Sequence, residues 1–160
     1  MNFRATAAFA ASLLAVTATH ASAQVERTGN PTGVIASTVS VPAGYKTVYL
    51  SGSTASPIDP AKPEVVGDTK QQTLSILTKM KATLEGMGMT MGDLVKINVF
   101  LVGDPAKEGK MDAPAMNEVF KTFFGTTEQP NKPARSTVQV AALGRPWVLV
   151  EIEGIAVKKP

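Results

Sequence analysis

The chain has 160 residues, with 16 Lys and Arg against 13 Asp and Glu, a single histidine and no cysteine. This length corresponds to about one domain, and the lack of cysteine excludes disulfides and thiol chemistry. The net charge of +3 comes with few aromatic residues and no basic stripe, so the composition gives no support for nucleic-acid binding.

The first 23 residues have the composition of a secretory signal peptide. Residues 1–4 give a positive start, residues 5–19 are small or apolar and almost uncharged, and Ala21-Ser22-Ala23 is a small-x-small cleavage pattern. A buried helix is the alternative, because Ala and Leu favour helices. The run is shorter than the roughly 20 apolar residues of a membrane span. We therefore expect cleavage after Ala23 and a periplasmic or secreted protein with no membrane attachment.

Cleavage after Ala23 limits the chemistry that remains. It removes Arg4 and His20, which leaves 15 basic against 13 acidic residues and a net charge of +2. The mature chain then has neither His nor Cys, which excludes Ser-His-Asp and Cys-His catalysis and zinc sites built on those residues. Any reaction must use Arg, Lys, carboxylates, hydroxyls, amides and backbone groups.

The domain itself is predicted at residues 37–160, after a flexible, polar and turn-rich leader at residues 24–36. Residues 39–41 and 47–50 are short β-prone runs on either side of Pro42-Ala43-Gly44, which has the composition of a turn. This pattern predicts a β-hairpin at the start of the domain.

A first amphipathic helix follows. Asp68 and Gln71 have the spacing of a capping box, which predicts the start of the helix, and Gly86 and Gly88 predict its end. Its apolar stripe consists of Leu77, Met80, Leu84 and Met87. A cluster of methionines can bind soft metals, but at helical spacing it more often belongs to the core.

A central strand is predicted at residues 94–102, which are mostly apolar and β-branched. Asp112 and Pro114 then predict the start of a second helix. Its apolar stripe consists of Met116, Val119, Phe120 and Phe123.

The last two strands are predicted at residues 135–142 and 147–157. The order β-β-α-β-α-β-β predicts a single α+β domain, with one mostly antiparallel sheet and two helices on one face. The other face would carry Glu151 and Glu153 among apolar residues, and glutamates are costly to bury unpaired. We therefore expect an oligomer with polar clefts at its subunit contacts.

Arg135 begins a strand directly after Pro133-Ala134. Its planar guanidinium group can bind a carboxylate through two hydrogen bonds. Glu151 lies on the following strand, where a hairpin could bring it near Arg135. The alternative is an ordinary cross-strand ion pair between these two residues. Lys96, on the apolar central strand, is either an amine of lowered pKa or a lysine whose stem packs while its amine reaches the edge.

Five segments give the chain a resemblance to a known family, the Rid family of reactive-intermediate enamine/imine deaminases, or YjgF-type proteins. They occur in the family's order, and the resemblance extends from Ser51 to Val157, about two-thirds of the chain. The segments are VYLSG (48–52), GDTKQQTLSILTKMKATLEGMGMTMGDLVKINVFL (67–101), MNEVFKTFF (116–124), PARSTVQVAAL (133–143) and VEIEGIAV (150–157). PARS and VEIEGIAV are the most specific of them.

The resemblance implies a homotrimer with a chorismate-mutase-like fold, ligand pockets between subunits and no cofactor. It implies that Arg135 holds the substrate carboxylate and that Glu151 positions the water that attacks the imine carbon. It further implies that Asn117 borders the cleft, and that Ser51 and Gly52 contribute hydroxyl and backbone groups.

Two positions depart from the family pattern. Thr137 stands where the family often has cysteine, although its backbone N–H could still bind a carboxylate oxygen. Ser37-Thr38-Val39 stands where the resemblance leads us to expect a tyrosine.

The resemblance predicts a cofactor-free enzyme that hydrolyses 2-imino or enamine acids to 2-oxo acids and ammonia, and the signal peptide predicts that this enzyme is exported. Its partners would be a small imino or keto acid and further copies of the chain. The alternative is a non-catalytic trimer that binds small carboxylates or other metabolites, or a holdase chaperone. Glu151 separates these alternatives, because a binder needs only Arg135.

Overall fold

The computed structural model describes residues 24–159, so the predicted signal peptide at residues 1–23 lies outside the described residues. None of the helices within residues 24–159 is long and apolar enough to cross a membrane. The strands are β1 (Glu26–Thr28), β2 (Thr38–Ser40), β3 (Lys46–Thr54), β4 (Leu94–Val102), β5 (Ala134–Val140) and β6 (Val150–Lys158), and the helices are α1 (Thr69–Gly86) and α2 (Ala113–Phe123).

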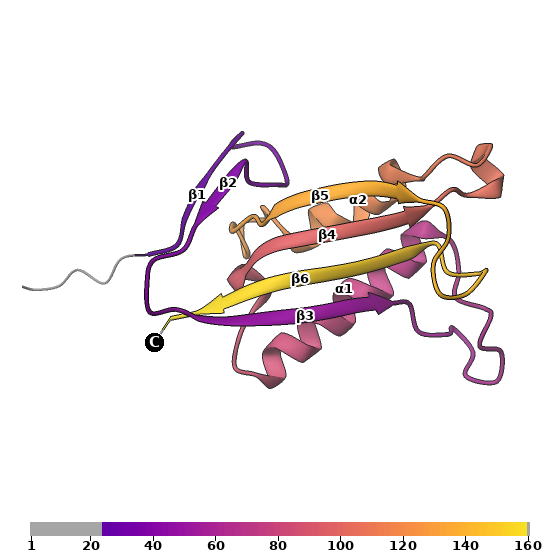
Figure 1. The fold of residues 1–160 in the computed structure, drawn as a ribbon, viewed down its shortest axis with the longest axis horizontal. Coiled ribbons are helices and arrows are strands. Elements are labelled where there is room, and N and C mark those ends of the chain that lie inside the picture. Colours follow the sequence, from indigo (N-terminus) through magenta and orange to yellow (C-terminus); the bar gives the residue numbers. More distant parts are fainter. Residues whose placement is uncertain (1–23, 160) are drawn as a thin grey trace, which may run out of the picture.

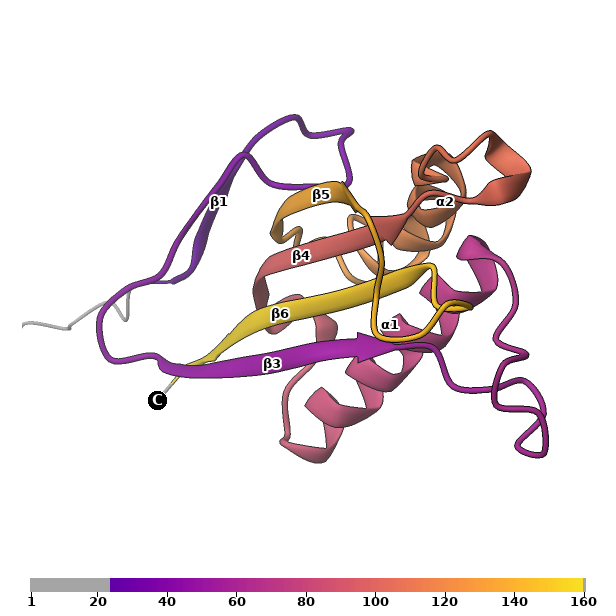
Figure 2. The same cartoon turned by 45° about the vertical axis from the view of Figure 1, so that its right-hand side comes forward.

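The main sheet has four strands in the order β3-β6-β4-β5, and both helices cover the same face of it (Figures 1 and 2). β6 is antiparallel to both of its neighbours, whereas β4 and β5 are parallel. A parallel pair needs a crossover connection, and α2 supplies it between β4 and β5. The predicted α+β class, mostly antiparallel sheet and one-sided helices are confirmed.

The predicted hairpin at the start of the domain is wrong. β2 pairs with β1 in a separate two-stranded ribbon, and β3 pairs with β6 instead. The ribbon also has a hydrogen bond of 2.7 Å between the hydroxyls of Thr28 and Thr38. β3 has nine residues and β2 only three. Pairing with β6 therefore gives β3 more backbone hydrogen bonds than pairing with β2 would. The predicted leader, residues 24–36, therefore contains a strand of its own.

Both helices begin where their capping residues predict. Asp68 accepts a hydrogen bond from the Gln71 backbone N–H at 2.8 Å, and the Gln71 side chain accepts one from the Asp68 N–H at 3.1 Å. Asp112 caps α2 by accepting from the Ala115 N–H at 3.1 Å. These contacts satisfy backbone donors that the first turn of a helix leaves without a partner.

The core lies between the helices and the sheet. The predicted stripe of α1 is buried at Leu77, Met80 and Leu84, but Met87 is 42% exposed because α1 ends just before it. The buried core side chains also include Ile76 of α1, Met116, Val119 and Phe120 of α2, Ile97, Val99 and Leu101 of β4, and Val150 and Ile152 of β6.

Gln72 is a fully buried polar side chain that ties α1 to the start of β6. Its amide nitrogen donates to the carbonyl oxygens of Gly67 and Trp147 at 2.8 and 3.2 Å. Its amide oxygen accepts from the N–H groups of Leu149 and Val150 at 2.9 and 3.3 Å. One side chain thereby satisfies four buried or half-buried backbone groups.

We expect Gln72→Leu to destabilise the protein by about 3 kcal/mol, because it leaves several backbone groups without partners in a dry environment. Gln71→Leu is the matched control, since it removes only an exposed capping contact and should cost about 1 kcal/mol. Urea unfolding of both variants at one protein concentration measures the difference. Equal losses for the two variants would contradict the role assigned to Gln72.

Candidate functional site

Arg135 lies near the start of β5 and points towards α2 rather than towards solvent. Its Nη2 donates to Asn117 Oδ1 at 2.8 Å, and its Nη1 lies 3.6 Å from the sulfur of Met116. The guanidinium carbon sits 4.3 Å from the centre of the Phe120 ring, a cation–π contact. Three residues of α2 thus fix the plane of the guanidinium group and leave other N–H donors for a ligand.

Burial lowers the pKa of Arg135 from its ordinary value. An arginine titrates so far above neutral pH that the group stays charged all the same. Within the described residues, none of the salt bridges involves Arg135. The half-buried cation is therefore suited to pair with an anion that comes from outside this chain.

Thr137 lies two residues after Arg135 on the same face of β5. Its register partner on β4 is Val99, as that of Arg135 is Ile97, and both of these partners are buried against the helices. The Thr137 hydroxyl is buried and has no hydrogen-bond partner among the described residues. It is thus a polar group beside Arg135 that a ligand could satisfy.

Glu151 lies on β6 and points to the face of the sheet without helices, since its neighbours Val150 and Ile152 are buried on the helix side. Its carboxylate packs over Gly52, and a Cβ atom built on Gly52 would overlap a carboxylate oxygen. The β3–β6 register shifts between Leu50 and Ser53, so Ser51 and Gly52 form a bulge at this point. The bulge and the missing side chain make room for the carboxylate.

The hairpin expected to bring Glu151 near Arg135 does not form, because β4 lies between β5 and β6. Two strand spacings across the sheet, roughly 10 Å, and a further three residues along β4 separate Arg135 from Glu151. Their side chains also point to opposite faces. This excludes the ordinary cross-strand ion pair within one chain. Arg135, Asn117 and Thr137 form one group, and Glu151 with Ser51 and Gly52 forms another.

Further polar contacts lie on the face of Glu151. The Lys96 amine donates to the Ser136 hydroxyl at 3.0 Å, so Lys96 uses a polar partner on the neighbouring strand, in line with the packed-stem alternative. Asn98 donates to Glu153 at 2.8 Å. A hollow of about 240 Å³ opens beside them, and Ser51 lines it.

A lysine of α1 holds the edge of the sheet near the bulge. The Lys79 amine donates to the backbone oxygen of Thr54, which is the register partner of Glu151. Burial lowers the pKa of Lys79. Lys79 also lines a hollow of about 430 Å³ together with Ser51 and Gly52.

Sequence reasoning missed part of the surroundings of Arg135. Met116 and Phe120 were assigned to the apolar stripe of α2, which is correct, but they also hold the guanidinium group. The signal that was available is the position of Phe120, three residues after Asn117 and four after Met116, because residues at these spacings are neighbours on a helix surface.

We expect Gly52→Ala to lower activity far more than stability. The added methyl group would displace the end of the flexible Glu151 side chain, which costs little folding energy but moves the carboxylate. Gly144→Ala is the matched control, since a Cβ at that position meets no atom within 4 Å. Thermal unfolding measures the stability of both variants, and the rate of imino-acid hydrolysis, the reaction expected from the sequence, measures their activity. A Gly52→Ala protein with full activity would show that the position of Glu151 does not matter.

The fold and the site define a class of small α+β proteins with a half-buried arginine at the start of one strand and a carboxylate on the open face of the sheet. The family model described as endoribonuclease L-PSP matches residues 36–158. The chain therefore belongs to this family, also known as Rid, YjgF or RutC.

Similar proteins include a RutC family protein of Pyrococcus horikoshii, 41% identical over 104 residues, which are 64% of this chain and 74% of that protein. A 2-iminobutanoate/2-iminopropanoate deaminase of Dermatophagoides farinae is 40% identical over 69% of this chain and 77% of that protein. The structure of Escherichia coli TdcF with bound serine is 36% identical, with a TM-score of 0.56 over 74% of this chain and 85% of that one.

The structure of the YjgF gene product of Escherichia coli is 37% identical, with a TM-score of 0.55 over 74% of this chain and 85% of that one. The expected YjgF-type, chorismate-mutase-like fold is thereby confirmed.

Proposed function

We propose that this protein hydrolyses 2-imino acids and their enamine tautomers to 2-oxo acids and ammonia, without a cofactor, in clefts between the subunits of a homotrimer. The observation that carries the proposal is the half-buried Arg135, fixed by Asn117 and Phe120 and without an acidic partner in the described chain. Relatives at 36–40% identity that bear the name 2-iminobutanoate/2-iminopropanoate deaminase support it.

In this mechanism Arg135 binds the substrate carboxylate through two parallel hydrogen bonds. Glu151 accepts a proton from a water molecule whose oxygen attacks the imine carbon. The proton taken up by Glu151 and the proton of the new hydroxyl group pass to the nitrogen. The carbon–nitrogen bond then breaks, the nitrogen leaves as ammonia, and the water oxygen becomes the oxygen of the 2-oxo acid. Positioning and acid–base assistance of this kind contribute roughly 10²–10⁴-fold to a rate.

The separation of Arg135 from Glu151 supports a site shared between two chains. One chain presents Arg135 towards α2 and Glu151 on the open face, so these two groups can meet one small substrate only if each comes from a different copy. The open face also exposes Tyr49 (77%) and Val138 (45%), apolar surface that an oligomer would cover. A closed ring of three copies gives three equivalent clefts.

The charge of the chain favours an imine over RNA as the substrate, although the family is described as an endoribonuclease. The mature chain would have a net charge of only +2 and no basic stripe, whereas binding a phosphate backbone depends on clustered Lys and Arg.

We also propose that the protein is exported and loses residues 1–23, which makes it periplasmic or secreted. Mass spectrometry of the protein recovered from the cell envelope and the medium tests this, and we expect a chain that begins at Gln24. A full-length mass in the cytoplasm would refute export.

The activity is tested by producing imino acids in place with an amino-acid oxidase and trapping the surviving imine with semicarbazide. We expect the wild-type protein to lower the amount of trapped imine in proportion to its concentration. If several imino acids, with small and large side chains, show no effect, the enzyme proposal fails. A small-carboxylate binder would then be the better description.

A further inference from the structure

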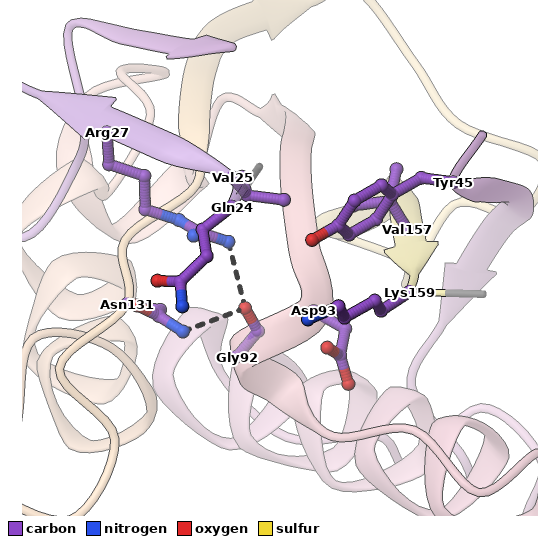
Figure 3. A pocket seen from close by; sticks show the side chains of 9 residues that line it. All are labelled: Gln24, Val25, Arg27, Tyr45, Gly92, Asp93, Asn131, Val157 and Lys159. Carbon is purple, nitrogen blue, oxygen red and sulfur yellow. Dashed lines mark hydrogen bonds between the residues drawn. The ribbon is translucent and has the colours of Figure 1, made fainter. Parts of the chain in front are cut away.

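A separate polar hollow of about 280 Å³ lies between the start of the chain's described part, the approach to β4 and the end of β6 (Figure 3). None of the residues assigned above to the deaminase lines it. Its polar lining consists of Gln24, Arg27, Tyr45, Asp93, Asn131 and Lys159.

Arg27 of β1 forms one wall of this hollow. Its Nη2 donates to the carbonyl oxygens of Gly92 and Leu94 at 2.9 and 3.5 Å, which orients the guanidinium group. Its Nε is buried and has no hydrogen-bond partner among residues 24–159. Burial lowers the pKa of Arg27, and Asp93 partly opposes this. Because Nε is enclosed, the oriented guanidinium group would act on an anion in the hollow through its charge and its terminal nitrogens.

The remaining lining is rich in donors. Asn131 donates to the Gly92 oxygen at 3.3 Å and thereby holds the same carbonyl group from the other side, as Figure 3 shows. Lys159 adds a second positive charge. Among the described residues that line the hollow, Asp93 is the single carboxylate, and the N–H and hydroxyl of Thr90 donate to its Oδ2 at 2.6 and 3.0 Å. The described lining therefore carries two cations against one carboxylate.

We propose that this hollow binds a small oxyanion, a phosphate or carboxylate group, between Arg27 and Lys159. An oxyanion supplies acceptor oxygens and no donors, which matches an oriented guanidinium, a lysine amine and the amide side chain of Gln24. The volume lies just below the range of roughly 300–1,000 Å³ of drug-sized ligand sites, so it suits a small ion rather than a large metabolite. This site is independent of the proposed deaminase.

The test is an NMR titration of the ¹⁵N-labelled protein with inorganic phosphate and, in a second arm, with sodium acetate, at constant ionic strength. We expect saturable shifts of Gly92, Asn131 and the Arg27 Nε–H group in at least one arm. The arm that saturates identifies phosphate or carboxylate as the recognised group. Shifts that grow linearly with both salts would overturn the proposal.

Variants distinguish a specific binding site in the hollow from nonspecific electrostatic attraction of anions to the protein. Lys159→Gln removes an exposed charge near the chain end and should weaken binding about two- to fivefold. Arg27→Lys keeps the charge but loses the planar fork, and should abolish saturation. The exposed Arg145→Gln should leave the affinity unchanged. Arg135→Ala should remove any acetate-dependent shifts around β5, while the saturating shifts of Gly92 and Asn131 persist. If Arg145→Gln weakened binding as much as Lys159→Gln, the proposal would also fall.

Discussion

Arg135→Ala is expected to lower kcat/KM for imino-acid hydrolysis by about 10²-fold, because two charge-assisted hydrogen bonds to the substrate carboxylate are lost. The semicarbazide assay measures this directly. The loss should appear mainly in KM for substrates that carry a carboxylate. Arg135→Lys should recover only part of the activity, since lysine keeps the charge but cannot offer the planar fork that Asn117 and Phe120 orient.

The control for Arg135→Ala is Arg145→Ala, which removes an exposed arginine that lies 5.9 Å above the Trp147 ring. It should keep wild-type activity. Circular dichroism of each variant must match the wild type, because Arg135→Ala also leaves Asn117 Oδ1 without its partner. A folded Arg135→Ala protein with unchanged kcat/KM would refute the role of Arg135 as the carboxylate-binding residue.

Mixing two inactive variants is expected to restore activity. Arg135→Ala and Glu151→Gln are each expected to be nearly inactive alone, since the loss of acid–base assistance costs about 10²–10⁴-fold. If each cleft takes Arg135 from one chain and Glu151 from its neighbour, random mixed trimers contain intact clefts. Statistics then predict about a quarter of the wild-type activity.

The complementation experiment uses chains refolded or co-expressed together, with each variant treated alone as the control. Light scattering should give the mass of a trimer for every sample. No recovery from a verified mixed trimer would mean that both residues act from the same chain, and the cleft between subunits would be wrong. A monomer by light scattering would contradict the same proposal more directly.

Recovery also distinguishes the enzyme from a metabolite-binding trimer. A binder needs only Arg135, so Glu151→Gln would retain the affinity of the wild type for a small carboxylate such as pyruvate. An enzyme requires both groups, and only an enzyme gains turnover from the mixture. The two measurements together therefore assign separate roles to Arg135 and Glu151.

Local patterns predicted most of the elements of this fold. The capping residues, the glycine stops and the apolar stripes act over three or four residues, so the sequence alone places α1, α2 and β4 correctly. The ends of β5 and β6 were less accurate, because residues 141–149 are β-prone in part but belong to the connection between these strands. Side-chain pattern does not define where a ladder of backbone hydrogen bonds ends.

These local patterns do not predict which strands pair with each other. β2 was assigned to β3 because they are adjacent in sequence, yet β2 pairs with β1 and β3 pairs with β6. β5 and β6 were assigned to a hairpin for the same reason. The crossover through α2 places β5 on the free edge of β4, so β6 lies on the other side of β4.

The sequence by itself determined the α+β class and the two helices, because these depend on local spacing. Its resemblance to the family singled out Arg135 and Glu151 as the expected site residues. Only the tertiary structure decided how these two residues are arranged. Their strands are separated by β4 and their side chains alternate to opposite faces, which depends on register across the whole sheet. For that reason the structure, rather than the sequence, excludes an ion pair between Arg135 and Glu151 within one chain, and the proposed site would need two chains to complete it.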